Sequence, residues 1–429
     1  MTRLLTLMGS GETAPTMVKV HRAIFEKVGD TATPAKSLFL DTPFGFQENA
    51  AELCVKTLDY FASSIVRPLT VAGIGRIDTM SVAEREAAFS RLAQAAVVFA
   101  GPGSPTYTLK QWAPTPIRTI LADKLRLGGA LTFSSAAVLT LGAATVPVYE
   151  IYKAGEDPYW LEGLNVLAEV GMNAAVIPHY NNAEGGHHDT RFCYLGERRL
   201  SVLEKSLATD HNDAYVLGLD EHTGVMIDLD AGSAQVVGLG VMTIRRNGVS
   251  VEIPTGTTLG IEVLIAGDAG ASSASVSMSV GDKGATTGGS QTTNPEVPAG
   301  SLAEEIDRCV LGFESALSTG DANAAATQAL TLDDAIEMWS KDMLQSRDPE
   351  RAKAALRSMI VRLGDAAVGG LRDPRETLGP VIEVALKARL EVRAAKRFDL
   401  SDLIRDGLAD CGIEVRDTPQ GQTWNLKEG

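Results

Sequence analysis

A long segment of small and polar residues divides this chain of 429 residues. Residues 266–300 (AGDAGASSASVSMSVGDKGATTGGSQTTNPEVPAG) are rich in Gly, Ser, Thr and Ala and contain almost no large apolar side chains. Such a segment buries too little surface to offset the entropy of ordering its backbone. A single hydrophobic core also rarely exceeds about 250–300 residues. We therefore predict a flexible linker over 266–300, between a front domain, residues 1–265, and a back domain, residues 301–429.

Composition narrows the class of protein. With 45% hydrophobic and 22% charged residues, the chain is typical of a globular protein. It has no apolar run of the roughly 18–20 residues that cross a membrane, and its start, MTRLLTLMGSGE, favours a first strand over a signal peptide, so we expect a cytoplasmic protein. The net charge of −15 argues against broad adhesion to nucleic acid or anionic membranes and leaves room only for a local basic patch. The four cysteines are widely spaced, which argues against disulfides and against a cysteine-rich zinc site; they are Cys54, Cys193, Cys309 and Cys411. No cofactor is predicted.

Short apolar runs alternate with helical patterns in the front domain, which predicts an α/β fold with a mostly parallel sheet between helices. The runs are RLLTLMG, SLFLDTP, VRPLTVAG, AAVVFAG, GALTFSS and AAVIPHY. Beyond His179, alternation at period two predicts late antiparallel strands. Ligands of open α/β sheets bind outside the carboxyl ends of the strands, so the residues that end these runs are candidate site residues.

These strand ends offer the parts of a serine nucleophile site. GALTF followed by SSAA and an apolar helix matches the strand, sharp turn and helix of a nucleophile elbow. The turn Gly101-Pro102-Gly103 suggests Gly103 as an oxyanion donor beside the N–H of Ala136. VIPHYNN places His179 at a strand end, and LGLDEHTG places Glu221 after an apolar run. Taken alone, the Gly-Pro-Gly turn is more often an ordinary loop, such a histidine is more often a loop or core residue, and the alternative for Glu221 is a solvated turn.

Taken in order, GPGSPTYTL, FSSAAV, PHY with GERRL, and GLDEHTG followed by VVGLG resemble the cyanophycinase and peptidase E family of serine peptidases. The resemblance covers most of residues 1–265 and implies a type 1 glutamine amidotransferase-like fold that cleaves a small peptide or amide. It places Ser135 at the nucleophile, His179 at the base and Glu221 at an acid. Glu150 competes with Glu221 for the orienting role, and Ser134 competes with Ser135.

Two departures bear on this resemblance. Phe133 and Ala137 stand where the family has glycines, and a misplaced oxyanion pocket can cost about 100-fold in rate. An insertion-like NNAEGGHHDT supplies residues that could replace His179, bind a metal or form a surface loop, although two adjacent histidines cannot easily face one ion; these are His187, His188 and Asp189.

A glycine-rich stretch follows the first apolar run. Gly9-Ser10-Gly11-Glu12 is too short for a dinucleotide-binding fingerprint. Its position at a carboxyl end predicts that Glu12 lines the pocket and favours a cationic substrate group.

The back domain carries apolar residues at three- and four-residue spacing, which predicts amphipathic helices. A further helix is expected over about 376–397. The next helix lies in FDLSDLIRDGLADCG, with Asp399 or Ser401 as its cap and Gly412 at its end. The tail IEVRDTPQGQTWNL predicts strand, turn and strand.

Residues 303–429 also resemble the C-terminal, anticodon-binding part of cysteinyl-tRNA synthetases. The matching positions are Arg389, Arg393, Lys396, Phe398, Asp402, Ile404, Arg405, Gly412 and Trp424. The chain lacks the HIGH-like and KMSKS-like motifs and the zinc thiolates of such enzymes, so synthetase activity is not expected.

Basic residues on the helix before this tail could hold RNA phosphates, and Trp424 could stack on an unpaired base. They are Lys387, Arg389, Arg393, Lys396 and Arg397. A solvated helix face with a core tryptophan is the alternative, and the module could instead hold a partner protein or a second subunit in a homodimer. The leading hypothesis is a serine hydrolase, ahead of a non-catalytic scaffold and a tRNA-associated protein.

Overall fold

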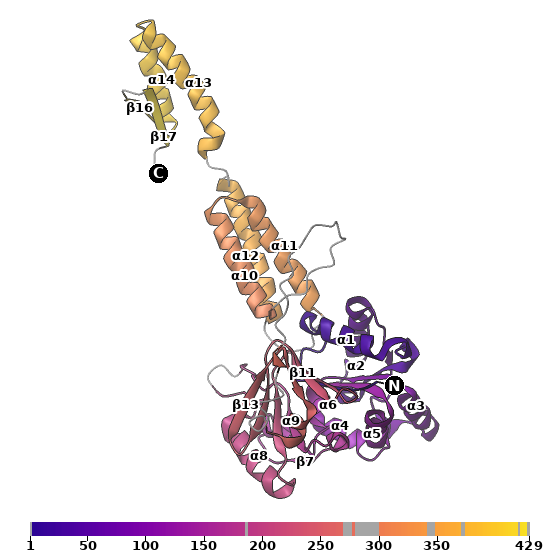
Figure 1. The fold of residues 1–429 in the computed structure, drawn as a ribbon. Coiled ribbons are helices and arrows are strands. Elements are labelled where there is room, and N and C mark those ends of the chain that lie inside the picture. Colours follow the sequence, from indigo (N-terminus) through magenta and orange to yellow (C-terminus); the bar gives the residue numbers. More distant parts are fainter. Residues whose placement is uncertain are drawn as a thin grey trace. The chain divides into compact units, whose positions relative to one another are not determined.

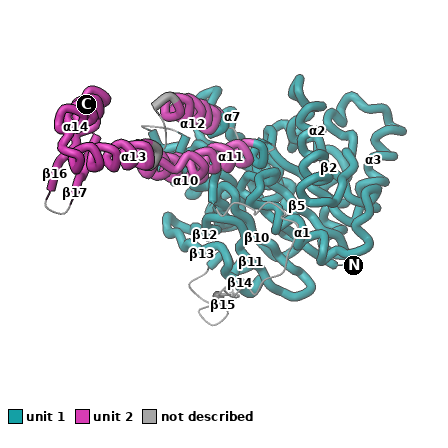
Figure 2. The backbone as a smooth tube through the Cα atoms, turned by 90° about the horizontal axis from the view of Figure 1, so that it is seen from above, with its two compact units in different colours: residues 1–302, 337–349 teal, residues 303–336, 350–429 magenta. Residues whose placement is uncertain are grey.

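The computed structural model describes residues 2–184, 188–268, 277–278, 300–340, 348–369, 374–418 and 421–426. These residues form two compact units, Met1–Leu302 with Glu337–Pro349 and Ala303–Ile336 with Glu350–Gly429 (Figures 1 and 2). Of the predicted linker, only 266–268, 277–278 and 300 are described, so most of that prediction lies outside the described residues.

The first unit is built on a nine-stranded sheet, in the order β15-β14-β11-β10-β1-β5-β4-β2-β3. The block from β1 to β3 is parallel, and antiparallel strands extend it beyond β1. The α/β class is thereby confirmed. The strands are β1 (Arg3–Met8), β2 (Ser37–Leu40), β3 (Thr70–Val71), β4 (Val97–Ala100), β5 (Gly129–Ser134), β10 (Thr223–Asp228), β11 (Ser233–Gly238), β14 (Thr257–Gly260) and β15 (Ser277–Met278).

Both faces of the parallel block are buried, which explains why its strands are continuous apolar runs. In β5, Leu131 and Phe133 join one core cluster while Ala130 joins another on the opposite face. The first cluster packs beneath α3 (Val82–Gln94), α4 (Pro105–Trp112) and α5 (Ile117–Leu127). The second packs beneath α1 (Val18–Val28) and α2 (Ala50–Tyr60).

A second sheet of four strands holds the next part of the chain, in the order β13-β12-β9-β8. Its strands are β8 (Ala174–Ile177), β9 (Tyr215–Leu219), β12 (Val241–Arg246) and β13 (Val249–Pro254). The run AAVIPHY therefore belongs to the four-stranded sheet and not to the parallel block. Helix α8 (Gly196–Asp210) packs on one face of the four-stranded sheet. The run VRPLTVAG forms only the two-residue edge strand β3, because Pro68 cannot donate to a ladder.

Short elements complete the first unit around the end of β5. They are α6 (Ser135–Leu139), β6 (Ala144–Thr145), α7 (Val148–Tyr152), β7 (Leu161–Glu162) and α9 (Ile261–Ala266). Helix α6 continues directly from β5, and α7 follows the β6 strand. This region carries the strand-to-helix turn that the sequence predicts for the nucleophile.

The second unit contains the predicted amphipathic helices and the predicted hairpin (Figure 1). Its helices are α10 (Leu302–Ser318), α11 (Ala322–Trp339), α12 (Asp348–Gly369), α13 (Pro374–Ala394) and α14 (Phe398–Asp410), and its strands are β16 (Ile413–Thr418) and β17 (Gly421–Leu426). The first residue of α10, the end of α11 from Glu337 and the start of α12 up to Pro349 are assigned to the first unit. Strands β16 and β17 pair antiparallel, and their side chains form a small core with α13.

The predicted cap of α14 is wrong. Arg397 is the residue at the N-cap, and it makes no side-chain cap bond. Asp399 lies in the first turn instead, where its charge suits the helix dipole, and it pairs with Arg397 at 3.0 Å. The predicted end is confirmed, since Gly412 follows the helix at a φ of 79°.

Candidate active site

Ser135 lies at a sharp turn between a buried strand and a helix. Strand β5 ends at Ser134, and α6 begins at Ser135, whose φ is 48°. A serine in this left-handed region is strained, and such strain concentrates at functional sites. The turn lifts the Ser135 side chain out of the sheet into a partly exposed position. This is the backbone geometry that a nucleophile elbow requires.

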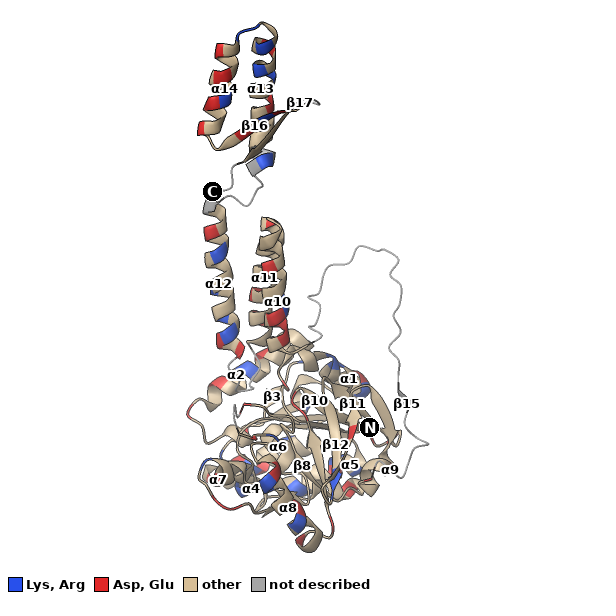
Figure 3. Cartoon of the chain, turned by 90° about the vertical axis from the view of Figure 1, so that its left-hand side faces the viewer, with Lys and Arg blue, Asp and Glu red and all other residues tan. Residues whose placement is uncertain are grey.

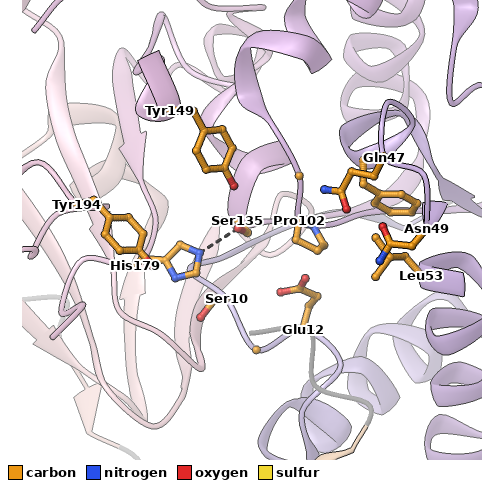
Figure 4. Close-up of a pocket in the computed structure, with 13 residues that line it drawn as sticks. Ser10, Glu12, Gln47, Asn49, Leu53, Pro102, Ser135, Tyr149, His179 and Tyr194 are labelled. Carbon is orange, nitrogen blue, oxygen red and sulfur yellow. Dashed lines mark hydrogen bonds between the residues drawn. The ribbon is translucent and has the colours of Figure 1, made fainter. Parts of the chain in front are cut away.

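His179 connects Ser135 to a carboxylate. It follows β8, also at a φ of 48°. Its Nε2 lies 2.9 Å from Ser135 Oγ, and its Nδ1 lies 2.9 Å from Glu221 Oε1. A dashed line in Figure 4 marks the contact between Ser135 and His179. Glu221 comes from the turn between β9 and β10. With Nδ1 protonated, Nε2 is an acceptor that faces the serine hydroxyl.

Electrostatics keep Glu221 ionised. Burial opposes its charge, but hydrogen bonds from His179 and Asn182 outweigh that effect, so the pKa of Glu221 lies below its usual value. Asn182 Nδ2 lies 3.4 Å from Glu221 Oε1, and Asn181 Oδ1 accepts the Glu221 backbone N–H at 2.8 Å. Sequence reasoning missed these two asparagines as site residues. Their signal was the pair NN two residues after His179 in VIPHYNN.

A cavity of about 180 Å³ opens beside Ser135 and His179. Its lining residues are Ser10, Gly11, Glu12, Phe44, Gln47, Asn49, Leu53, Pro102, Gly103, Ser135, Tyr149, His179 and Tyr194 (Figure 4). Gly103 has a φ of 145°, and a Cβ there would lie 1.9 Å from the carbonyl oxygen of Pro43. Only glycine fits this wall. Ala136 follows Ser135 in the first turn of α6, where N–H groups have no acceptor within the helix.

The residues that replace the family glycines pack away from the cavity. Phe133 is fully buried and meets Trp112 edge-on at 6.1 Å between ring centroids. Ala137 is also fully buried, and its N–H donates to the carbonyl of Gly101 at 3.2 Å. Neither is among the residues that line the cavity.

The two adjacent serines have different surroundings. Ser134 is fully buried, and its Oγ donates to Glu12 Oε2 at 2.7 Å. Ser135 is partly exposed and contacts His179. The expectation that Glu12 lines the pocket is met, because its carboxyl forms part of the wall opposite Tyr149 in Figure 4.

The remaining candidates lie elsewhere. Glu150, in α7, accepts a hydrogen bond from Thr106 Oγ1 at 3.0 Å, whereas the carboxylate that reaches His179 is that of Glu221. His187 lies outside the described residues. Asp189 pairs with Arg191 at 2.9 Å, and this contact holds the pKa of Asp189 well below its usual range. Among the described residues, no group of three or more His, Cys, Asp or Glu side chains could hold a metal ion.

Some of the basic residues of the second unit form ion pairs with aspartates. Arg389 is 1% exposed and donates to both carboxylate oxygens of Asp417, at 2.7 and 3.0 Å. Arg393 donates to the same carboxylate at 2.6 Å. Arg397 pairs with Asp399, while Lys396 is exposed. Helix α13 carries both basic and acidic residues, whereas α14 carries mostly acidic ones (Figure 3).

Trp424 lies in the hairpin core. Its partly buried ring packs against the cluster of Ile382, Leu386 and Ile413. The tryptophan therefore contributes to the module's own packing. The structure thus places Arg389 and Trp424 inside the module and leaves Lys387 and Lys396 at its surface.

Comparison with known proteins finds one family model. The model of the cysteinyl-tRNA ligase anticodon binding domain matches residues 375–424. Curated relatives include the cysteine–tRNA ligases of Arthrobacter sp. (strain FB24), 38% identical over 20% of this chain and 19% of that protein, and of Bifidobacterium longum (strain NCC 2705), 31% identical over 32% and 29%. The chain thus spans less than a third of the length of these relatives.

Solved structures match the first part of the chain. One is a peptidase from an acI-B1 actinobacterium, with 20% identity and a TM-score of 0.48 over 61% of this chain and 97% of that one. Another is a candidate peptidase E from Listeria monocytogenes EGD-e, with 15% identity and a TM-score of 0.35 over 56% and 100%. Within the described residues, no helix has the length and apolar character needed to cross a bilayer.

Proposed function

We propose that the first unit is a serine hydrolase that cleaves a small peptide or amide through an acyl-enzyme. The observation that carries this proposal is the continuous line from Ser135 Oγ to His179 Nε2 and from His179 Nδ1 to Glu221 Oε1, with 2.9 Å at each step. A strained serine at the start of a helix adds support. The adjoining cavity leaves room for a substrate carbonyl.

The proposed reaction follows from these positions. Ser135 Oγ attacks the carbonyl carbon while its proton moves to His179 Nε2, and the carboxylate of Glu221 stabilises the imidazolium. The N–H groups of Gly103 and Ala136 would receive the negative oxygen. His179 then protonates the leaving amine as the carbon–nitrogen bond breaks. Water, deprotonated by His179, releases the acid from the ester and restores Ser135.

Phosphonate labelling tests this proposal. A fluorophosphonate should form a phosphonate ester at Ser135 and lose fluoride, which intact mass and peptide mapping detect. Ser135→Ala should prevent the label, and mapping distinguishes Ser135 from its neighbour Ser134. Circular dichroism must show that each protein is folded. A folded wild-type protein that takes up no label contradicts the hydrolase and favours a non-catalytic scaffold.

A second candidate function concerns RNA. The match of residues 375–424 to an anticodon binding domain favours tRNA as a partner of the second unit, without synthetase activity. Lys387 and Lys396 are two of the exposed basic residues on and beside α13 that could contact phosphates; Arg393 and Arg397 are also exposed but pair with Asp417 and Asp399. Binding of cysteine tRNA should weaken as salt rises, and Lys387→Glu with Lys396→Glu should weaken it further. Binding that is absent, or insensitive to both changes, contradicts this function.

A further inference from the structure

The loop after β1 presents two buried polar groups to the cavity. Ser10 is 2% exposed, and its Oγ has no hydrogen-bond partner among the described residues. Glu12 is 3% exposed, and one carboxyl oxygen accepts from Ser134. Both residues line the cavity that contains Ser135 (Figure 4). A buried hydroxyl and carboxyl with unused acceptor capacity cost free energy unless a ligand satisfies them.

The protein holds this loop in place. The carbonyl oxygen of Glu12 lies 2.8 Å from His21 Nε2, and the Tyr60 hydroxyl donates to another carbonyl of the loop at 2.9 Å. Gly11 has a φ of 67°, and a Cβ there would lie 2.0 Å from the imidazole of His222. The loop therefore cannot shift readily, and the Glu12 carboxyl is directed into the cavity before any ligand binds.

Among the described residues that line the cavity, Glu12 is the acidic residue, and no lysine or arginine balances it. Burial raises the pKa of Glu12 above its usual value, against the opposing effect of the hydrogen bond from Ser134. No lysine or arginine is among the described residues that line the cavity. A ligand cation beside Glu12 would therefore meet no competing positive side chain in the described wall, except His179 when it carries a proton. Such a cation would favour the ionised form of the Glu12 carboxyl.

We propose that Ser10 and Glu12 bind a protonated amine carried by the acyl part of the substrate, beside the carbonyl that Ser135 attacks. This inference rests on the proposed hydrolase and names the substrate class of the same site. The ammonium donates to Glu12 and to Ser10 Oγ, which satisfies the acceptor that is unpartnered in the described residues. The amine is either a lysine-type side chain or the free α-amino group of the acyl residue.

Four phosphonate probes distinguish these sources. They are diphenyl α-aminoalkylphosphonates with a lysine or a norleucine side chain, each with a free or an acetylated α-amino group. Ser135 Oγ attacks phosphorus and expels phenol, so the rate of labelling reports how well each acyl mimic binds. A hydrogen bond between two charged groups predicts a preference of about tenfold or more for the probe with the correctly placed cation.

Two variants locate the preference. In Glu12→Gln the cationic and uncharged probes should label at equal rates. In contrast, Glu52→Gln, which changes an exposed carboxylate on α2 beside the cavity residue Leu53, should keep the preference for the cationic probe. Equal rates for all four probes on the wild-type protein overturn the inference and leave the hydrolase intact. A preference that survives Glu12→Gln also overturns it. Failure of every probe and of fluorophosphonate overturns both.

The wild-type protein alone provides a further test, should Glu12→Gln fail to fold. The ratio of rates for a cationic and an uncharged probe cancels the effects of pH that both reactions share. This ratio should fall as pH falls, because Glu12 takes up a proton. A ratio that exceeds one but stays constant from neutral to acidic pH overturns the role of Glu12.

Discussion

Replacing Glu221 by Gln tests which acid orients His179. Gln keeps the size of the side chain and an oxygen that can accept from Nδ1–H, but it removes the charge opposite the imidazolium. Glu221 Oε1 lies 2.9 Å from Nδ1, and the Glu221 side chain is only 20% exposed, so water screens the contact weakly. A hydrogen bond to a charged group contributes about 1.5–3 kcal/mol, which corresponds to a labelling rate roughly 10- to 150-fold lower.

The measurement is the second-order rate of fluorophosphonate labelling at Ser135. Glu150→Gln serves as the paired variant, because Glu150 contacts Thr106 rather than His179 and its loss should leave the rate close to that of the wild type. Thermal unfolding of both variants checks that neither change acts through the fold. If Glu221→Gln labels at the wild-type rate while Glu150→Gln labels slowly, the relay through Glu221 is wrong and Glu150 is the orienting acid.

Three further predictions concern stability. Phe133→Ala should lower the free energy of unfolding by about 3–5 kcal/mol in chemical denaturation, because it leaves a cavity against Trp112; a smaller loss would contradict the packing of Phe133 in the core. Asp417→Asn removes the negative charge and one of the two acceptor oxygens that the buried Arg389 contacts and, allowing for the exposure of Asp417, should destabilise the hairpin by about 1–3 kcal/mol; unchanged hydrogen exchange in β16 would refute this. Burial lowers the pKa of His21 to about 4, so the unfolded state binds more protons between pH 6.5 and 4, and stability should fall by roughly 3 kcal/mol as pH decreases through this window. In calorimetry, His21→Gln should reduce that slope, and an equal slope in both proteins would count against it.

Local patterns predicted the elements well where burial follows a simple rule. The parallel strands are apolar on both faces, so RLLTLMG, SLFLDTP, AAVVFAG and GALTFSS were recognisable as strands. The cap of α14 was not, because Arg397 occupies that position and Asp399 acts through its charge. The sequence also could not predict that β8 belongs to the second sheet, because an apolar run does not indicate which strands it pairs with.

The candidate site shows the same division. Ser135, His179 and Glu221 were nameable from motifs, but the choice between Glu221 and Glu150 depended on which turn comes near β8 in space. Asn182 was missed because its role exists only next to Glu221.

The sequence by itself determined the α/β class, the turn that exposes Ser135 and the relationship of residues 375–424 to anticodon binding domains. These features follow from local periodicity, from turn residues and from a contiguous motif. Only the tertiary structure decided that Phe133 faces the core, that Arg389 is bound by Asp417, and that Ser10 and Glu12 share a cavity with Ser135. The physical reason is that side-chain partners far apart in the chain are selected by strand order and packing, which no local pattern records.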